Sequence, residues 1–156
     1  MGYLELFNLL PEIGMKETRS ITINGNNSAL PLGDYAIVEL YCDDPTCDCR
    51  RVILSVCSPQ YKKSLAFITY GWESINFYAR KLHMNTKNLS ESDRRFLGKL
   101  KGPCLDPLIP QSNLASDALK LVVKYAINDK EYIDRVKRHY KLFKEEIKRL
   151  HVIKEK

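Results

Sequence analysis

Three cysteines lie close together in one short stretch, Tyr41-Cys42-Asp43-Asp44-Pro45-Thr46-Cys47-Asp48-Cys49-Arg50-Arg51. Cys42 closes one predicted strand, and Cys47 and Cys49 stand at the far end of the loop that follows it. Because a hairpin brings its strand ends to about 5 Å, the three thiols should gather at one end of a sheet. Thiolates repel one another, and a soft divalent cation such as Zn²⁺ relieves that repulsion. The stretch therefore predicts a structural zinc site with Cys42, Cys47 and Cys49 as ligands.

The spacing C-x4-C-x-C leaves the fourth ligand open. His139, beside the apolar stripe of the last predicted helix, would complete a Cys₃His site, and Cys104, in a proline-rich connector, would complete a Cys₄ site. His83, a loop aspartate or a water molecule are further alternatives. Cys57 is excluded, because an extended strand places it about 26 Å from Cys49. We favour His139 over His83, with Cys104 as its equal rival.

Two other interpretations of the thiols remain open. Without metal they would be free or would form a disulfide such as Cys42–Cys49, and a metal with an open position would allow Lewis-acid catalysis. The chain contains no phosphate-binding glycine loop, nucleophile elbow or metalloprotease motif, and no His-x-Glu of a zinc deaminase. The sequence therefore predicts no catalytic residue, and an enzyme is the least supported interpretation.

The cysteine stretch resembles an uncharacterised family of prokaryotic proteins. The resemblance rests on a Tyr-Cys-Asp-x-Pro-x-Cys-Asp-Cys-Arg-Arg-Val core, which spans Tyr41 to Val52 here. It extends to Gly71-Trp72-Glu73 and to Arg138-His139-Tyr140. It implies no function, but it makes an accidental cluster of cysteines less plausible.

The first half of the chain predicts the strands that must position these thiols. Their short connections favour an antiparallel meander, because a parallel crossover needs a dozen or more residues. Along the second strand, alternation places Glu39 on one face with three apolar neighbours, and we expect that carboxylate to face solvent. The predicted strands are Ser20 to Ile23, followed by a turn at Asn24 to Asn27, then Tyr35 to Cys42, Arg50 to Val56 and Leu65 to Tyr70.

The second half predicts helices. The residues Ser90-Glu91-Ser92-Asp93 resemble a capping box, and Gly102-Pro103 ends the helix that they open. That helix carries Phe96, Leu97 and Leu100. The other predicted helices are Glu73 to His83, Leu114 to Ile127 and Lys130 to about Ile153, with an irregular connector over residues 103–110. Strands in 1–72 and helices in 73–156 predict one α+β domain over residues 1–156, with the sheet packed on the helices.

Charge is divided unevenly along the chain. The net charge is −3 from Met1 to Tyr78 and +9 from Ala79 to Lys156. A basic half favours an anionic partner, nucleic acid being the commonest. No stretch approaches the roughly 18 apolar residues of a membrane span. With 44% apolar and 28% charged residues and few cysteines, we expect a cytoplasmic, thiol-reduced protein without a membrane partner.

The last predicted helix offers two surfaces. Its apolar stripe, with intervals of 3 and 4, comprises Ile133, Val136, Tyr140, Phe143, Ile147 and Leu150. We expect the first half of the stripe to pack on the sheet, while the distal turns would meet a protein partner or a second copy in a homodimer. On the polar side, Arg138, Lys141 and Lys148 are the predicted phosphate contacts. Nucleic-acid binding is the preferred function, and a protein-interaction or homodimerisation module is the alternative.

Overall fold

A computed structural model describes residues 2–25 and 28–156. Its sheet is antiparallel, with β3 (Gly33–Cys42), β4 (Arg51–Cys57) and β5 (Ala66–Gly71) at its centre. Two short strands, β1 (Tyr3–Glu5) and β2 (Arg19–Ile23), pair with opposite ends of β3 along the same edge. At the other edge, β6 (Cys104–Leu105) pairs with β5. The predicted meander is therefore confirmed, as is the α+β class.

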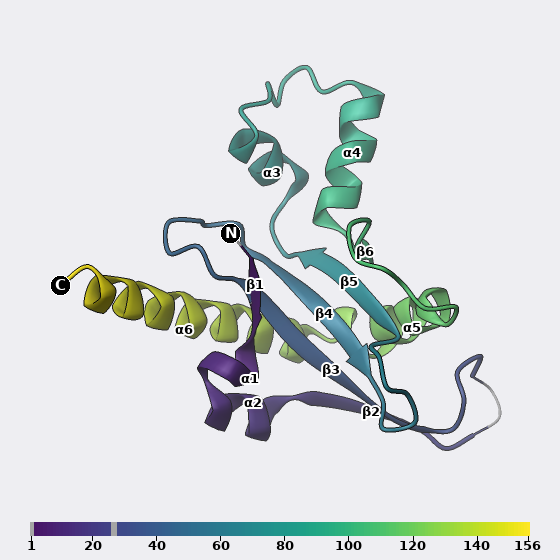
Figure 1. Ribbon diagram of the computed structural model, residues 1–156. Coiled ribbons are helices and arrows are strands. Elements are labelled where there is room, and N and C mark those ends of the chain that lie inside the picture. Colours follow the sequence, from purple (N-terminus) through teal and green to yellow (C-terminus); the bar gives the residue numbers. More distant parts are fainter. Residues whose placement is uncertain (1, 26–27) are drawn as a thin grey trace.

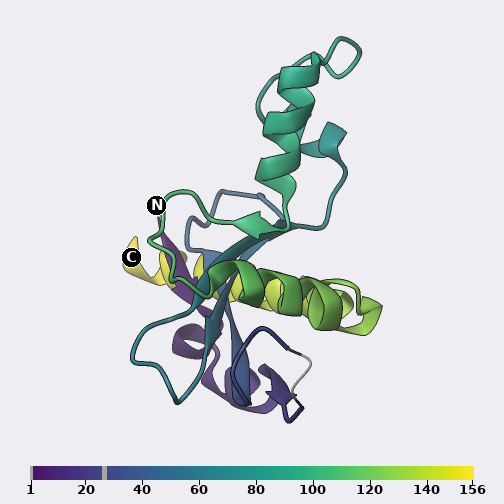
Figure 2. The same ribbon diagram turned by 90° about the vertical axis from the view of Figure 1, so that its right-hand side faces the viewer.

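The helices fall into three groups (Figure 1). The N-terminal pair α1 (Leu6–Leu9) and α2 (Pro11–Glu17) lies between β1 and β2 in the chain. The next two, α3 (Ile75–Lys81) and α4 (Glu91–Lys101), project away from the sheet in both views (Figures 1 and 2). The C-terminal pair comprises α5 (Ala115–Val122), which continues into a π-helical turn η1 (Val123–Ile127), and the long α6 (Lys130–Lys154). Within the described residues, no helix is long and apolar enough to cross a membrane.

The core forms between one face of the sheet and the C-terminal helices. Burial alternates along β3, where Tyr35, Ile37 and Tyr41 are fully buried. Side chains of α5 and α6 cover them, including Val122, Val136 and Phe143. The first half of the predicted stripe of α6 is thus buried within its own chain. Val152 and Ile153, near the end of the helix, are more than half exposed.

The N-terminal segment was not predicted to hold secondary structure. Pro11 occupies the first turn of α2, a position that suits its fixed φ and missing N–H. Helices of four and seven residues and a three-residue strand are too short to produce a clear period in the sequence. The predicted irregular connector also contains the short strand β6. Of the predicted turn at Asn24 to Asn27, residues 26 and 27 lie outside the described residues.

The pair α3 and α4, with the chain that joins them to the sheet (residues 74–103), is called the helical arm below. It has an apolar cluster of its own, built on Tyr78, Ala79 and Leu97. The predicted capping box is confirmed, since Ser90 and Asp93 each bond the other's backbone N–H. Phe96, one of the three apolar residues named for this helix, is 55% exposed.

An added methyl group should have opposite effects on stability at Gly71, the last residue of β5, and at Gly98, inside α4. A Cβ at Gly71 would lie 2.1 Å from the Tyr78 hydroxyl, which is held by a 2.9 Å hydrogen bond to the Arg50 carbonyl. We expect Gly71→Ala to lower the free energy of unfolding by about 1–3 kcal/mol through overpacking. Gly98, inside α4, has no atom within 4 Å of such a Cβ. There Ala should raise stability by up to about 1 kcal/mol, because glycine is a poor helix former. Urea denaturation of both variants measures these changes, and equal effects would contradict the prediction.

Candidate metal centre

The hairpin of β3 and β4 brings three thiols together. Cys42 is the last residue of β3, and Cys47 and Cys49 lie in the loop that leads into β4. The three Sγ atoms all lie within 4.8 Å of one another. A tetrahedral zinc with Zn–S bonds of 2.3 Å separates its sulfur ligands by about 3.8 Å. Small side-chain adjustments would bring the three Sγ atoms to that separation. All five cysteines of the chain are free thiols.

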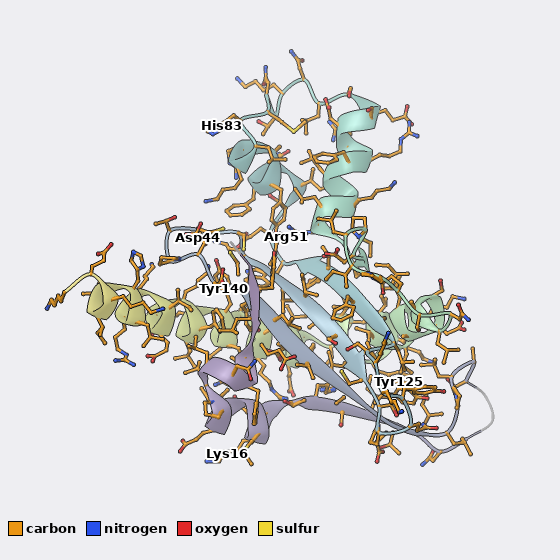
Figure 3. The ribbon with its side chains drawn as sticks, viewed as in Figure 1. Lys16, Asp44, Arg51, His83, Tyr125 and Tyr140 are labelled. Carbon is orange, nitrogen blue, oxygen red and sulfur yellow. The ribbon has the colours of Figure 1, made fainter. Side chains whose placement is uncertain are left out.

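Side chains of helix α6 form hydrogen bonds with the cysteine loop, residues 43–50 between β3 and β4. The buried Lys144 ammonium donates hydrogen bonds of 2.8 Å to the carbonyls of Cys42 and Asp44. One turn earlier, the Tyr140 hydroxyl donates to Asp48 at 3.2 Å and accepts from the Arg50 N–H at 3.3 Å. Figure 3 shows Asp44 and Tyr140 at the same end of the sheet. Both ends of the loop are thus tied to one helix.

The loop is also stabilised by its own polar side chains. Asp44 accepts hydrogen bonds from the backbone N–H and the hydroxyl of Thr46, at 2.8 and 2.7 Å, which closes a tight turn before Cys47. Arg50 adopts a positive φ of 48° and forms ion pairs of 3.1 Å with both Asp48 and Glu73. The thiols therefore sit on a structured loop rather than a loose one.

Without metal, the thiols of Cys42 and Cys47 favour the protonated form. Burial raises the pKa of the Cys42 and Cys47 thiols, and the negative charge that Cys49 would carry raises the pKa of Cys47 further. Lys144 acts in the opposite direction on both, but more weakly. Tyr3, opposite Cys42 in the sheet, has its pKa raised to about 12 by burial and by the same cysteines. A bound cation would compete with protons here, so its affinity must rise with pH.

The structure places His139 away from the thiols, in a partly buried polar clamp with Glu39 and Glu17. Its Nδ1 lies 2.7 Å from a Glu39 carboxylate oxygen, and its Nε2 lies 2.6 Å from one of Glu17. Glu39 also accepts a 2.6 Å hydrogen bond from the Tyr41 hydroxyl and is only 3% exposed. The expectation that Glu39 faces solvent was therefore wrong. His139 offers no free nitrogen to a metal in this arrangement.

The other candidate ligands also lie outside the thiol group. Cys104, in β6, pairs with Thr69 in the sheet, and its thiol donates to the Lys99 carbonyl at 3.0 Å. His83 lies on the helical arm just after α3 (Figure 3). Cys57, at the opposite end of β4, contacts the Ser64 hydroxyl at 3.4 Å. Within the part of the chain that the structure describes, no fourth His, Cys, Asp or Glu joins the three cysteines.

Two of the three predicted phosphate contacts lie beside the cysteine loop. Lys141 and Lys148 are exposed and, with Lys144 and Cys47, line a hollow of about 330 Å³ between α6 and the loop. Arg138 is also exposed, but it pairs with Glu17 at 2.5 Å and so belongs to the polar clamp. Lys144, which donates hydrogen bonds to the cysteine loop, is the site residue that was not predicted from the sequence. Its position four residues after Tyr140, on the buried side of α6, was the available signal.

Comparisons with family models, with curated proteins and with solved structures found no match to the chain. The site is therefore interpreted from its own geometry.

The polar clamp predicts how stability depends on pH. Burial lowers the pKa of His139, but hydrogen bonds and charges from Glu39 and Glu17 outweigh burial and raise it above its ordinary value of 6.5. Hydrogen bonds from Arg138 and then His139 lower the pKa of Glu17 to about 2. The stabilisation from His139 is complete below pH 6.5 and is lost as the pH rises through the raised value. That from Glu17 is complete above its ordinary pKa of 4.5 and is lost as the pH falls toward 2.

We therefore expect the free energy of unfolding to fall as the pH rises above 6.5, and His139→Gln to flatten that fall. Urea denaturation at several pH values measures the slope, and His151→Gln, at an exposed position, is the matched control. Should His139→Gln not fold, the imidazole of the unaltered protein can be titrated by NMR. An NMR pKa below 6.5, or an unchanged slope in the folded variant, would contradict the prediction.

Proposed function

We propose that this protein is a small zinc-stabilised domain that binds nucleic acid. The observation that carries the metal assignment is the grouping of three Sγ atoms within 4.8 Å. Sulfur-only donors favour Zn²⁺ over Mg²⁺ or Ca²⁺, which prefer oxygen. The cation would join the end of β3 to the start of β4, because its ligands come from both sides of one hairpin. Its role is structural, as a crosslink within the central part of the sheet.

A cation of the protein supports this assignment. Three thiolates carry one negative charge more than Zn²⁺ neutralises. The Lys144 ammonium, which is bonded to the Cys42 carbonyl and forms no ion pair with a described carboxylate, offsets that excess. The fourth position falls to a water or an external ligand, since neither His139 nor Cys104 joins the group. Both side chains have hydrogen-bond partners elsewhere in the fold.

Metal content and thermal stability test the zinc assignment. We expect protein purified without added metal to carry about one zinc per chain, and a chelator to lower the melting temperature. Cys47→Ser should lose the zinc and melt at a lower temperature even before chelation. Cys57→Ser is the matched control, because its thiol lies at the other end of β4, and it should retain the metal. Elemental analysis and thermal melts measure both. Metal-free protein whose melting a chelator leaves unchanged would refute the zinc assignment.

The basic surface beside the cysteine loop supports nucleic-acid binding. Lys141 and Lys148 are exposed on the same side of α6 as the hollow next to Cys47. Neither forms an ion pair with a described carboxylate, so their charges are available to an anionic partner. A metal-stabilised loop would hold this surface rigid, which reduces the ordering that binding requires.

Salt dependence tests the nucleic-acid assignment. Replacing Lys141 and Lys148 by Gln should weaken oligonucleotide binding and reduce the slope of log K against log salt by about 1.4–1.8, the contribution of two phosphate contacts. The control replaces Lys62 and Lys63, two exposed lysines of the β4–β5 connection, by Gln. Fluorescence anisotropy at several salt concentrations measures both. If the unaltered protein binds neither DNA nor RNA at low salt, the assignment fails.

A further inference from the structure

The helical arm is the most basic projecting part of the molecule. Residues 74–103 contain seven Lys or Arg and two Asp or Glu, a net charge of +5 against +6 for the whole chain. Lys81 pairs weakly with Asp48 at 3.8 Å, and the Lys101 ammonium donates to the Glu73 carbonyl. The other five cations form no ion pair with a described carboxylate: Arg80, Lys87, Arg94, Arg95 and Lys99. Such a concentration of unpaired positive charge fits an anionic partner.

The outer face of α4 combines these charges with an aromatic ring. Its exposed positions Ser92, Arg95, Phe96 and Lys99 follow the spacing i, i+3, i+4, i+7, so they share one side of the helix. Leu97, on the opposite side, is fully buried in the apolar cluster of the arm. Phe96, 55% exposed, therefore stands beside two cations on a surface that needs no aromatic for packing.

The arm borders the cysteine loop. At its base, Lys81 lies 3.8 Å from Asp48 of that loop, and the charges of Arg50 and Lys81 lie 4.8 and 5.3 Å from the centre of the Phe77 ring. The basic surface of α6 borders the same loop from the other side, where Lys141 and Lys148 share a hollow with Asp48. A chain of phosphates that contacts α6 would thus reach α3, at the base of the arm.

We propose that the outer face of α4 is a contact surface for single-stranded nucleic acid, in which Arg95 and Lys99 bind phosphates and Phe96 stacks on a base. This proposal rests on the nucleic-acid binding proposed above and specifies its second surface and its ligand class. Positive charge with an exposed ring is the combination that binds unpaired strands without sequence preference. The face presents no Asn or Gln to read adenine edges in a duplex groove.

The two contributions can be separated by two variants of α4. Arg95→Gln with Lys99→Gln removes charge and should weaken binding of a fluorescent 20-nucleotide oligo(dT), with a salt slope reduced by about 1.4. Phe96→Ala removes only the ring, and it should weaken binding at least about fivefold while the salt slope stays unchanged. Both changes lie at exposed positions of α4, and circular dichroism would verify that the variants are folded. The Lys62→Gln with Lys63→Gln variant is again the control and should bind like the unaltered protein.

The outcomes distinguish this proposal from the one on which it rests. If the unaltered protein binds no oligonucleotide at low salt, nucleic-acid binding as a whole fails. If it binds, but both α4 variants match the control while Lys141→Gln with Lys148→Gln weakens binding, only the arm proposal is overturned. Equal affinity for a duplex of the same length with no effect of Phe96→Ala would overturn the single-strand assignment. Binding to anionic phospholipid vesicles, and not to the oligonucleotide, would overturn it in favour of a membrane surface.

Discussion

The position of α6 along the sheet is the constraint on which the rest of the structure depends, and buried polar contacts set it. The His139 imidazole lies between carboxylates of α2 and β3, and its two ring nitrogens are 2.6 and 2.7 Å from their oxygens. Apolar packing alone would tolerate small shifts of a helix, whereas a buried charged group must meet its partners at hydrogen-bond distance. The Tyr41 hydroxyl adds to the same network by donating to Glu39 at 2.6 Å.

The geometry of the cysteine loop follows from that position. Because an α-helix rises 1.5 Å per residue, Lys144 lies about 7.5 Å further along α6 than His139. At that distance its ammonium meets the carbonyls of Cys42 and Asp44. Tyr140 bonds the other end of the loop and packs against Trp72 with ring centres 5.1 Å apart. If α6 were displaced, neither Lys144 nor Tyr140 could form its contact with the loop. The hydrogen bonds of His139 and the geometry of the thiols therefore depend on the same position of α6.

Much of this arrangement could be predicted from the sequence, because its signals are local. Alternation along residues 35–42, the capping box at Ser90 and the apolar stripe of the last helix each depend on residues close together in the chain. The grouping of the three thiols followed from hairpin geometry alone. The role of His139 could not be predicted, because its partners Glu17 and Glu39 lie 122 and 100 residues away in the chain. A polar residue on an apolar stripe indicates a buried partner but does not identify it.

The arm connects two neighbouring strands of the sheet, and this has a topological consequence. Strands β5 and β6 are antiparallel neighbours, with Thr69 opposite Cys104. The arm is therefore an enlarged β-hairpin connection, whose two ends leave the sheet side by side. A connection of this kind tolerates insertion and replacement, because the register of the flanking strands does not depend on its length. The sheet with its cysteine loop and the helices of the arm are thus free to diverge in sequence at different rates. Packing constrains the sequence of the sheet, whereas the surface that the arm contacts constrains the sequence of its helices.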